Sequence, residues 1–443
     1  MLITKLERRI EDAAISLPVG FEKGQVFTPR FLATWVALLL KEHLGEHWSG
    51  NLLDPACGDG ELLDAAFEQL PNAKLFGMDI DADASRAAQT RLGRLAVIKT
   101  EDMLLSPSVN KRRQSFKTGA VISNPPWGAD LLHSSGRLRA LGYSLANGQF
   151  DSWSLFVEMS LQALEDGGMA VFILPDAIFS PEHAPTRSLI SKNHTVELIA
   201  RLGEGIFKGI YRGTTVLLVR KSKPKPTHVV EVLRLSKTQR AAVLSGDLDL
   251  QNTRKSSSHK VNQSRFLSDP GCRWDIDVRT SDQNLLGRIE AAGGSWTDLV
   301  VSGRGVELSK RGLVKVCSNC ARVTPAPTRP RDVICQGCGL TAHSEGMATQ
   351  QIVETGTEKQ PGFMPLIVGE DIGRYALSCS RQIKLNVTGI NYKSHELYSQ
   401  ERLLVRKTGV GLKATVTKKA AASNQVVFHY VPLSKEQNFF LYY

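Results

Sequence analysis

The tetrapeptide Asn124-Pro125-Pro126-Trp127 combines the residue types needed to hold a flat, amino-bearing group. The Asn124 amide oxygen and the Pro125 carbonyl can accept two amino hydrogens, and the Trp127 ring can stack on the plane of the group. Two consecutive prolines cannot continue a sheet ladder or a helix, so the backbone here is stiff. The pattern indicates a site where an amino nitrogen attacks an electrophile. A plain Asn-Pro-Pro turn before a buried tryptophan is the alternative.

Residues 51–60 form a second group, in which a short apolar run leads into a glycine turn. Gly58 and Gly60 allow the backbone to approach a ligand closely, and Asp54 can accept a hydrogen bond from an ammonium group or from the loop itself. The next apolar run ends in Asp79, 79 − 60 = 19 positions after Gly60. Nucleoside-binding folds place an acid on the ribose hydroxyls at a similar spacing. Because the loop lacks a Gly-x-Gly-x-x-Gly pattern, it predicts a nucleoside ligand without a pyrophosphate.

A parallel sheet would bring these groups to one edge. Short apolar runs at 51–53, 74–78, 96–98 and 120–122 precede the polar residues, and parallel strands carry ligand-binding residues at their carboxyl ends. Asp102 follows the third run, where its carboxylate can accept an adenine amino group. The sequence therefore predicts an α/β fold with the candidate site at the carboxyl edge of its sheet.

A loop at residues 24–29 precedes a helix predicted over 31–44. Thr28 has the side chain of an N-cap, and Pro29 fits the first helical turn. The start of a helix offers free N–H groups to a carboxylate. A bare cap without any function is the alternative.

In this order the motifs resemble those of class I S-adenosylmethionine-dependent DNA adenine-N6 methyltransferases of the gamma-ordered, TaqI-like group. The resemblance covers roughly residues 22–220 and implies a Rossmann-like sheet. It implies cofactor contacts from eight residues: Thr28, Asp54, Ala56, Gly58, Gly60, Asp79, Asp102 and Asn124. It also implies catalytic roles for three residues of the tetrapeptide: Asn124, Pro125 and Trp127.

The same resemblance implies how the target base is held. The glycine-rich stretch at 202–219 matches the late hairpin of the family, and Phe207 matches the aromatic that packs on the base opposite Trp127. A phenylalanine in such a loop is otherwise a core anchor. Trp127 stands where tyrosine or phenylalanine is more usual, so the stacking role survives but any contact of a tyrosine hydroxyl is lost.

Four of the seven cysteines form two Cys-x-x-Cys pairs, separated by 335 − 320 − 1 = 14 residues. Four thiolates at this spacing close a tetrahedral site, so the sequence predicts structural Zn²⁺ in a zinc ribbon at about 313–342. The ligands are Cys317, Cys320, Cys335 and Cys338. A redox dithiol is the alternative. This use of cysteine favours metal over disulfides and a reducing compartment, so we expect a cytoplasmic protein.

The net charge of +11 is unevenly placed. Residues 1–220 carry 23 Lys+Arg against 25 Asp+Glu, whereas residues 221–443 carry 32 against 19. A basic half attached to a neutral catalytic half is typical of a polyanion-binding enzyme, although a merely soluble basic domain gives the same count. No apolar run reaches membrane-spanning length, and the first residues lack a signal-type apolar core.

These observations predict four segments. We expect an N-terminal helix at 1–20, a methyltransferase domain at 21–225, a basic linker or mobile loop at 226–262, and a mainly β target-recognition domain at 263–443 that carries the zinc ribbon. The predicted reaction is methyl transfer from S-adenosylmethionine to N6 of a flipped-out adenine in duplex DNA, in restriction–modification or phage defence, with an endonuclease or defence subunits as further partners. RNA adenine or protein glutamine methylation, and a non-catalytic DNA-binding subunit, are the alternatives.

Overall fold

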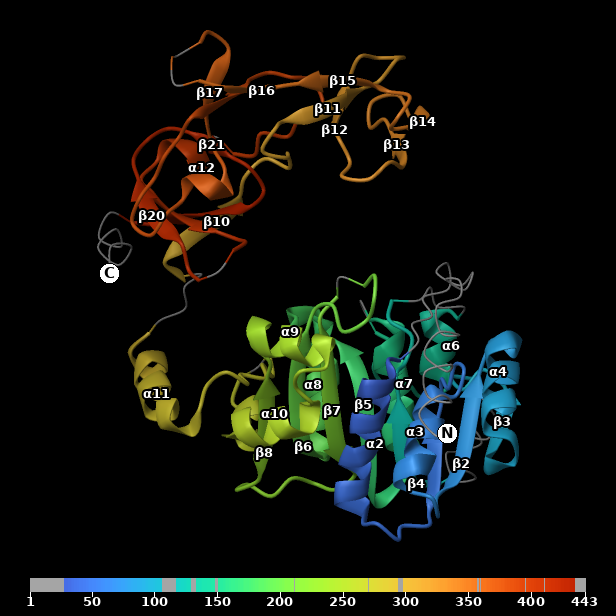
Figure 1. Ribbon diagram of the computed structural model, residues 1–443. Helices are drawn as coiled ribbons and strands as arrows, with labels where there is room; N and C mark the ends of the chain where they lie inside the picture. The colour runs from blue at the N-terminus through green and yellow to red at the C-terminus, as the bar shows by residue number, and fades with distance from the viewer. Residues whose placement is uncertain are drawn as a thin grey trace. The chain divides into compact units, whose positions relative to one another are not determined.

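The structure is a computed structural model that describes residues 28–105, 117–128, 133–147, 150–210, 212–269, 271–293, 298–356, 358, 360–394, 396–409 and 411–434. The helix predicted over 1–20 lies outside these residues. The chain divides into two compact units, Met1–Leu286 and Gly287–Tyr443, within α11 (Gln283–Ala292). Figure 1 shows the elements of each unit.

The first unit is built on a nine-stranded sheet in the described part of the chain. Its strands are β1 (Asn51–Asp54), β2 (Lys74–Asp79), β3 (Ala96–Thr100), β4 (Thr118–Ser123), β5 (Leu164–Pro175), β6 (Thr195–Gly203), β7 (Thr214–Arg220), β8 (Val229–Arg234) and β9 (His259–Asn262). Their order is β3-β2-β1-β4-β5-β7-β6-β8-β9. Only β7 and β9 run antiparallel to their neighbours. The order changes direction between β1 and β4, where open α/β sheets bind ligands. The Rossmann-like sheet is therefore confirmed.

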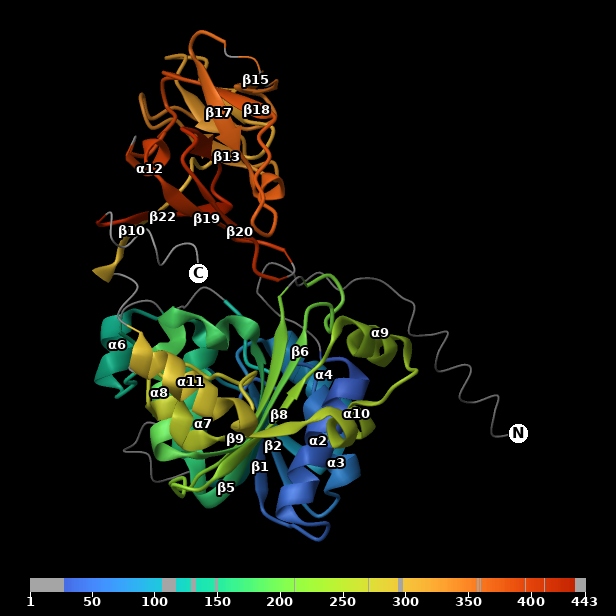
Figure 2. The ribbon, with the colours of Figure 1, turned by 90° about the vertical axis from the view of Figure 1, so that its left-hand side faces the viewer.

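Helices cover both faces of this sheet (Figure 2). One layer contains α2 (Arg30–Leu44), α3 (Glu61–Gln69), α4 (Ala82–Leu92), α9 (Lys237–Ser245) and α10 (Leu250–Ser257); the other contains α6 (Ser135–Ala140), α7 (Ser152–Ala163) and α8 (Ala184–Asn193). Because side chains alternate along a strand, β5 supplies both cores. Met169, Val171 and Ile173 enter the first core, whereas Ala170 and Phe172 enter the second.

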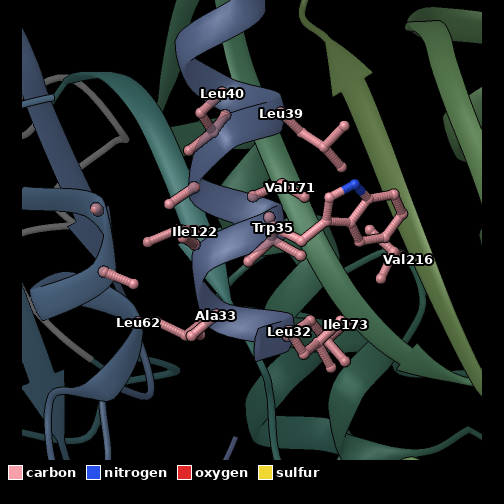
Figure 3. Close-up of a cluster of buried hydrophobic side chains, with 14 of the residues drawn as sticks. Leu32, Ala33, Trp35, Leu39, Leu40, Leu62, Ile122, Val171, Ile173 and Val216 are labelled. Atoms are coloured by element: carbon pink, nitrogen blue, oxygen red, sulfur yellow. The ribbon is translucent and has the colours of Figure 1, made fainter. Parts of the chain in front are cut away.

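The helix α2 lies directly over the centre of the sheet. Its Trp35 packs in one apolar cluster with Ile122 of β4, Val171 and Ile173 of β5, and Val216 of β7 (Figure 3). Arg30, at its first turn, forms ion pairs with Glu61, Asp64 and Glu68 of α3. These contacts fix the start of α2, and hence Thr28, beside the loop that follows β1.

The prediction of a linker or mobile loop at 226–262 is wrong, because this segment folds into strands β8 and β9 of the sheet and helices α9 and α10. Val230, Val232 and Val261 are fully buried. Arg254 of α10 forms ion pairs with Glu231 of β8 at 2.7 Å and with Glu42 of α2 at 2.6 Å. The polar composition of the segment reflects a solvated helix face rather than a loop.

The boundary predicted at 262/263 is corrected as well, since the first compact unit extends to Leu286. Arg187 of α8 is buried and donates hydrogen bonds to the carbonyls of Cys272 at 2.8 Å and Gly271 at 3.0 Å. Trp274 donates to the hydroxyl of Ser191 at 2.9 Å. These bonds hold residues 271–274 against the nine-stranded sheet.

The second unit is mainly β, as predicted. One four-stranded sheet contains β10 (Val300–Arg304), β22 (Val427–Pro432), β19 (Arg402–Arg406) and β20 (Ala414–Thr417), and another contains β16 (Val353–Thr355), β18 (Arg381–Lys384), β17 (Phe363–Ile367) and β21 (Ala422–Ser423). Smaller sheets join β12 (Val323–Pro325), β11 (Leu313–Val316) and β15 (Ala348–Gln351), and β13 (Asp332–Ile334) and β14 (Thr341–His343); α12 (Glu396–Ser399) precedes β19. Within the described residues, no helix has both the length and the apolar character needed to cross a membrane.

Candidate active site

The predicted site residues lie at the carboxyl ends of four adjacent parallel strands. Asp54 of β1 pairs in register with Gly77 of β2, and Asp79 pairs with Thr100 of β3. Asp79 therefore lies two residues beyond the partner of Asp54, and Asp102 lies two residues beyond the partner of Asp79. Asn124 immediately follows β4, the neighbour of β1 on its other side. The sheet thus brings these residues to the switch point, as the sequence predicted.

The glycine loop after β1 is held by Asp79. The Asp79 carboxylate accepts hydrogen bonds from the Gly58 N–H at 2.8 Å and from the Asp81 N–H at 2.9 Å. Gly58 and Gly60 have φ values of +53° and +85°, a region that strongly favours glycine. A Cβ on Gly60 would lie 3.2 Å from the Cα of Ala88 in α4. Burial raises the pKa of Asp79, and the two N–H donors lower it in part. The half-buried Asp79 carboxylate therefore fixes the conformation of the loop.

Asp54 lies entirely beneath the same loop. Its Oδ1 accepts the N–H of Ala56 at 3.1 Å, whereas its buried Oδ2 has no hydrogen-bond partner among the described residues. Burial raises the pKa of Asp54 to about 8; the Ala56 N–H opposes this shift, and the nearby charge of Asp79 adds to it. Asp54 therefore acts on the loop, one of the two roles predicted for it.

Asp102 is held by a histidine that the sequence did not reveal. His133 Nε2 donates to Asp102 Oδ2 at 2.5 Å, and the Leu104 N–H donates to Asp102 Oδ1 at 3.0 Å. The Tyr143 hydroxyl donates to the Leu104 carbonyl at 3.0 Å, so the segment after the tetrapeptide packs against the turn that carries Asp102. His133 lies 31 positions from Asp102, and no local spacing signals the pair.

Asn124 contacts the segment that precedes α2. Its Nδ2 donates to the hydroxyl of Thr28 at 3.1 Å, which fixes the orientation of the amide. The predicted N-cap role of Thr28 is wrong, because Pro29 is the N-cap residue and α2 has no side-chain cap. The threonine hydroxyl instead links the segment that precedes α2 to the candidate catalytic amide.

The two prolines do not leave both of their carbonyls to a ligand. The carbonyl of Pro126 accepts a hydrogen bond from the Ser152 hydroxyl at the start of α7, at 2.7 Å. The carbonyl of Trp127 accepts one from Arg212 Nη1 at 3.4 Å. These bonds hold the tetrapeptide from both sides. Neither Ser152 nor Arg212 was singled out in the sequence.

Trp127 and Phe207 do not form an open sandwich in this structure. Their ring centroids lie 5.3 Å apart at an interplanar angle of 78°, so the rings meet edge to face. Both are buried in the first core, and Trp127 Nε1 donates to the Ile173 carbonyl at 3.3 Å. The two rings are neighbours, but a base can enter between them only if one ring moves, so the predicted stacking on a base stays a prediction. Phe207 lies between Gly205 and Gly209, both at positive φ, which makes its loop the more adaptable side.

The four cysteines of the second unit converge as predicted. Cys317 and Cys338 Sγ lie 3.6 Å apart, Cys320 and Cys335 Sγ lie 3.5 Å apart, and all four sulfurs lie within 4.8 Å of one another. A tetrahedron with Zn–S bonds of about 2.3 Å has S···S edges of roughly 3.8 Å. The two Cys-x-x-Cys turns lie between β11 and β12 and between β13 and β14. The donor set and spacing fit Zn²⁺.

A protein-family model matches the part of the chain that carries these residues. A family model described as N-6 DNA Methylase matches residues 17–259, more than half of the chain. The chain belongs to the N-6 DNA methylase family. This match includes the Thr28 segment, all three acids, the tetrapeptide and Phe207, and it continues to the end of α10, beyond the predicted domain end at residue 225.

Individual relatives are distant. The chain is 22% identical over 220 residues to the methylase subunit of the type I restriction enzyme EcoEI of Escherichia coli, covering 45% of this chain and 43% of that protein. It is 27% identical to the type II methyltransferase M.TthHB8I of Thermus thermophilus, covering 46% of each. A solved type I restriction–modification methyltransferase subunit of Streptococcus thermophilus superposes with a TM-score of 0.45 at 16% identity, over 57% of this chain and 58% of that one. The chain spans less than half the length of the two sequence relatives.

Proposed function

We propose that this protein is a site-specific methyltransferase that transfers a methyl group from S-adenosylmethionine to N6 of adenine in duplex DNA. The observation that carries the proposal is the contact between the Asn124 amide and Thr28, at the edge where Asp79 and Asp102 also lie. This contact joins the segment expected to bind the methionine end of the cofactor to the group expected to bind the base. A nucleoside-binding fold without methyl transfer has no need for that link.

The cofactor site follows the strand ends. Gly58 and Gly60 admit the cofactor to the backbone, Asp79 accepts from the ribose hydroxyls, and Asp102 accepts from the adenine amino group. His133 acts on Asp102 by fixing one carboxylate oxygen, which leaves a defined direction for the amino hydrogen. S-adenosylmethionine, when bound, supplies a methyl group on a positively charged sulfur. The protein therefore needs to orient its substrates rather than to supply a strong base.

The base site uses Asn124 and Pro125. Adenine N6 is a poor nucleophile because its lone pair is conjugated into the ring, and acceptance of both amino hydrogens favours the pyramidal nitrogen of the transition state. The amino group is unreachable inside a duplex, so the base must be flipped out. We propose that Phe207 moves off the edge of Trp127 and that the two rings then hold the base from opposite faces.

The second unit supplies DNA recognition in this proposal. Residues 287–443 contain 20 Lys+Arg and 12 Asp+Glu, counted along the sequence. The four cysteines would bind a structural Zn²⁺ that ties two short hairpins together. Unoxidised thiols of this kind belong to a reducing cytoplasm. A restriction endonuclease or other defence subunits are the further partners proposed, since one sequence relative is named as the methylase subunit of a type I restriction enzyme.

Radiolabelled methyl transfer to three substrates tests the proposal. We expect label to enter unmethylated duplex DNA, and Asn124→Ala to abolish this transfer. Transfer to RNA or to a protein glutamine instead of DNA would replace the proposed substrate. Binding of DNA without transfer to any substrate would indicate a non-catalytic DNA-binding subunit.

A further inference from the structure

Two neighbouring turns of the second unit carry large apolar side chains into solvent. Tyr375 lies in the turn between the 3-10 helix η8 (Gly369–Asp371) and β18, and Leu412 lies in the β19–β20 hairpin. Both side chains are 79% exposed, the highest values among the exposed large hydrophobic residues described. The Tyr375 N–H donates to the Ala414 carbonyl at 2.9 Å, which joins the two turns. We call residues 373–376 the tip turn.

The tip turn is rigidly anchored. A bridge between Ile372 and Leu377 closes its base, and the Gly373 N–H donates to the Ala376 carbonyl at 2.9 Å. Below the bridge, the buried Asp371 carboxylate accepts the Val368 N–H at 2.8 Å and Arg381 Nη1 at 3.1 Å. The exposed tyrosine is therefore presented by a fixed backbone.

Tyr375 has a backbone conformation that is unfavourable for a bulky residue. Its φ is +59°, in the left-handed region that bulky residues rarely adopt and that glycine or asparagine fills with less strain. The Arg374 guanidinium lies 5.6 Å from the centre of its ring, on the same exposed turn. Burial does not explain an aromatic side chain at this place, and strained backbone positions cluster at functional sites.

The surrounding sequence is strongly basic. Residues 371–420 contain ten Lys+Arg and three Asp+Glu, counted along the sequence. Arg374 and Lys407 are exposed on the two turns, and Lys413 is half-exposed beside Leu412. One of the three acids, Asp371, is buried and paired with Arg381, and one of the ten basic residues, Arg402, is fully buried. The occupant of this surface is therefore a polyanion that also offers an apolar or aromatic face.

We propose that the tip turn contacts duplex DNA. Tyr375 inserts at a base step and stacks on the base faces that become exposed there, and Arg374 and Lys407 neutralise adjacent phosphates. Wedge residues inserted at base steps unstack and kink DNA, and base–aromatic stacking tolerates any sequence. The tip turn thereby grips the duplex from which the target base is extruded. This inference rests on the proposed DNA methyltransferase function.

Binding to a fluorescein-labelled, random-sequence DNA duplex tests the role of each side chain by anisotropy. Tyr375→Ala is expected to weaken binding about 5- to 150-fold without changing its salt dependence, whereas Tyr375→Trp keeps the affinity within a few-fold. Arg374→Ala is expected to lower the log–log salt slope by about one. Val301→Ala, at a half-exposed position on β10, is the matched control and binds like wild type.

Tyr375→Gly separates binding from folding. Glycine accepts φ = +59° without strain, so its melting temperature is expected to equal or exceed that of wild type while DNA affinity falls as in Tyr375→Ala. Wild-type affinity in Tyr375→Ala and Tyr375→Gly, together with a wild-type salt slope in Arg374→Ala, would overturn the inference. Preferential competition by RNA over duplex DNA would overturn it too. If the wild-type protein methylates DNA and the Tyr375 variants bind and methylate DNA equally well, this inference alone is refuted. If DNA binding depends on Tyr375 but no methyl group is transferred, the proposed function alone is refuted.

Discussion

The variant Asp54→Asn tests whether a neutral carboxyl group lies under the glycine loop after β1. Asp54 is fully buried, and one of its oxygens lacks a hydrogen-bond partner among the described residues. Burial raises its pKa to about 8 from an ordinary value of 3.8. An acid whose pKa is raised by folding keeps its proton in the folded state, so stability falls as the pH rises from the unfolded to the folded pKa.

The size of the effect follows from this shift. Each unit of pKa corresponds to about 1.4 kcal/mol, so the whole shift corresponds to roughly 6 kcal/mol, and the part between about pH 5 and pH 8 to roughly 4 kcal/mol. Asparagine resembles the protonated acid and does not titrate. The free energy of unfolding of Asp54→Asn minus that of wild type should therefore increase by up to this amount across the interval.

Urea unfolding followed by tryptophan fluorescence measures this difference. Five of the six tryptophans lie in the first unit, so the signal reports mainly on the fold around Asp54. Asp83→Asn, at an exposed position in the first turn of α4, controls for the loss of a surface carboxylate. A difference between Asp54→Asn and wild type that does not vary with pH would refute the reasoning.

Three further predictions concern the cofactor and the metal. Asp79→Ala should weaken cofactor binding by roughly 1.5 to 3 kcal/mol in calorimetric titration, because the ribose hydroxyls lose a charged acceptor and the Gly58 N–H loses its partner; unchanged affinity would place the ribose acid elsewhere. His133→Ala should reduce the preference for methylthioadenosine over methylthioinosine by about tenfold, because Asp102 loses a charge-assisted hydrogen bond, and His133→Gln should restore part of it; tighter binding by His133→Ala would show that the histidine competes with adenine for Asp102. Metal analysis should find about one Zn²⁺ per chain, and Cys335→Ser should lower this content and destabilise the cysteine hairpins, since metal binding contributes folding free energy; a metal-free but fully folded second unit would contradict the zinc assignment.

The strand-end acids could be predicted because their signals are local. An apolar run followed by Asp54, Asp79 or Asp102 places each side chain at the end of its own strand, and parallel pairing then gathers them without any further information. The positive φ values of Gly58 and Gly60 likewise follow from a tight turn that only glycine accommodates easily. These parts of the site depend on sequence neighbours alone.

The contacts between distant segments could not be predicted in the same way. His133 meets Asp102, and Thr28 meets Asn124, only after the sheet and α2 have formed. The edge-to-face packing of Trp127 on Phe207 depends on the rotamers of a buried core. Patterns in one sequence indicate which residues lie near the site, but not which atoms touch.

The prediction for residues 226–262 was wrong for a different reason. Its abundant Ser, Lys, Gln and Asn residues are typical of loops, yet β8 joins the sheet with three buried residues, Val230 and Val232 on one face and Leu233 on the other. The polar residues then lie on the exposed sides of α9 and α10, and Arg254 is satisfied by two carboxylates. Average composition conceals this arrangement.

Mass spectrometry of nucleosides tests the central claim most directly. Unmethylated duplex DNA is incubated with the protein and S-adenosylmethionine that carries a trideuterated methyl group, and the DNA is then digested to nucleosides. We expect trideuterated N6-methyldeoxyadenosine from the wild-type protein and none from Asn124→Ala, whose cofactor affinity should stay near that of wild type. Deuterated methyl groups on cytosine, or equal yields of N6-methyldeoxyadenosine from both proteins, would contradict the account.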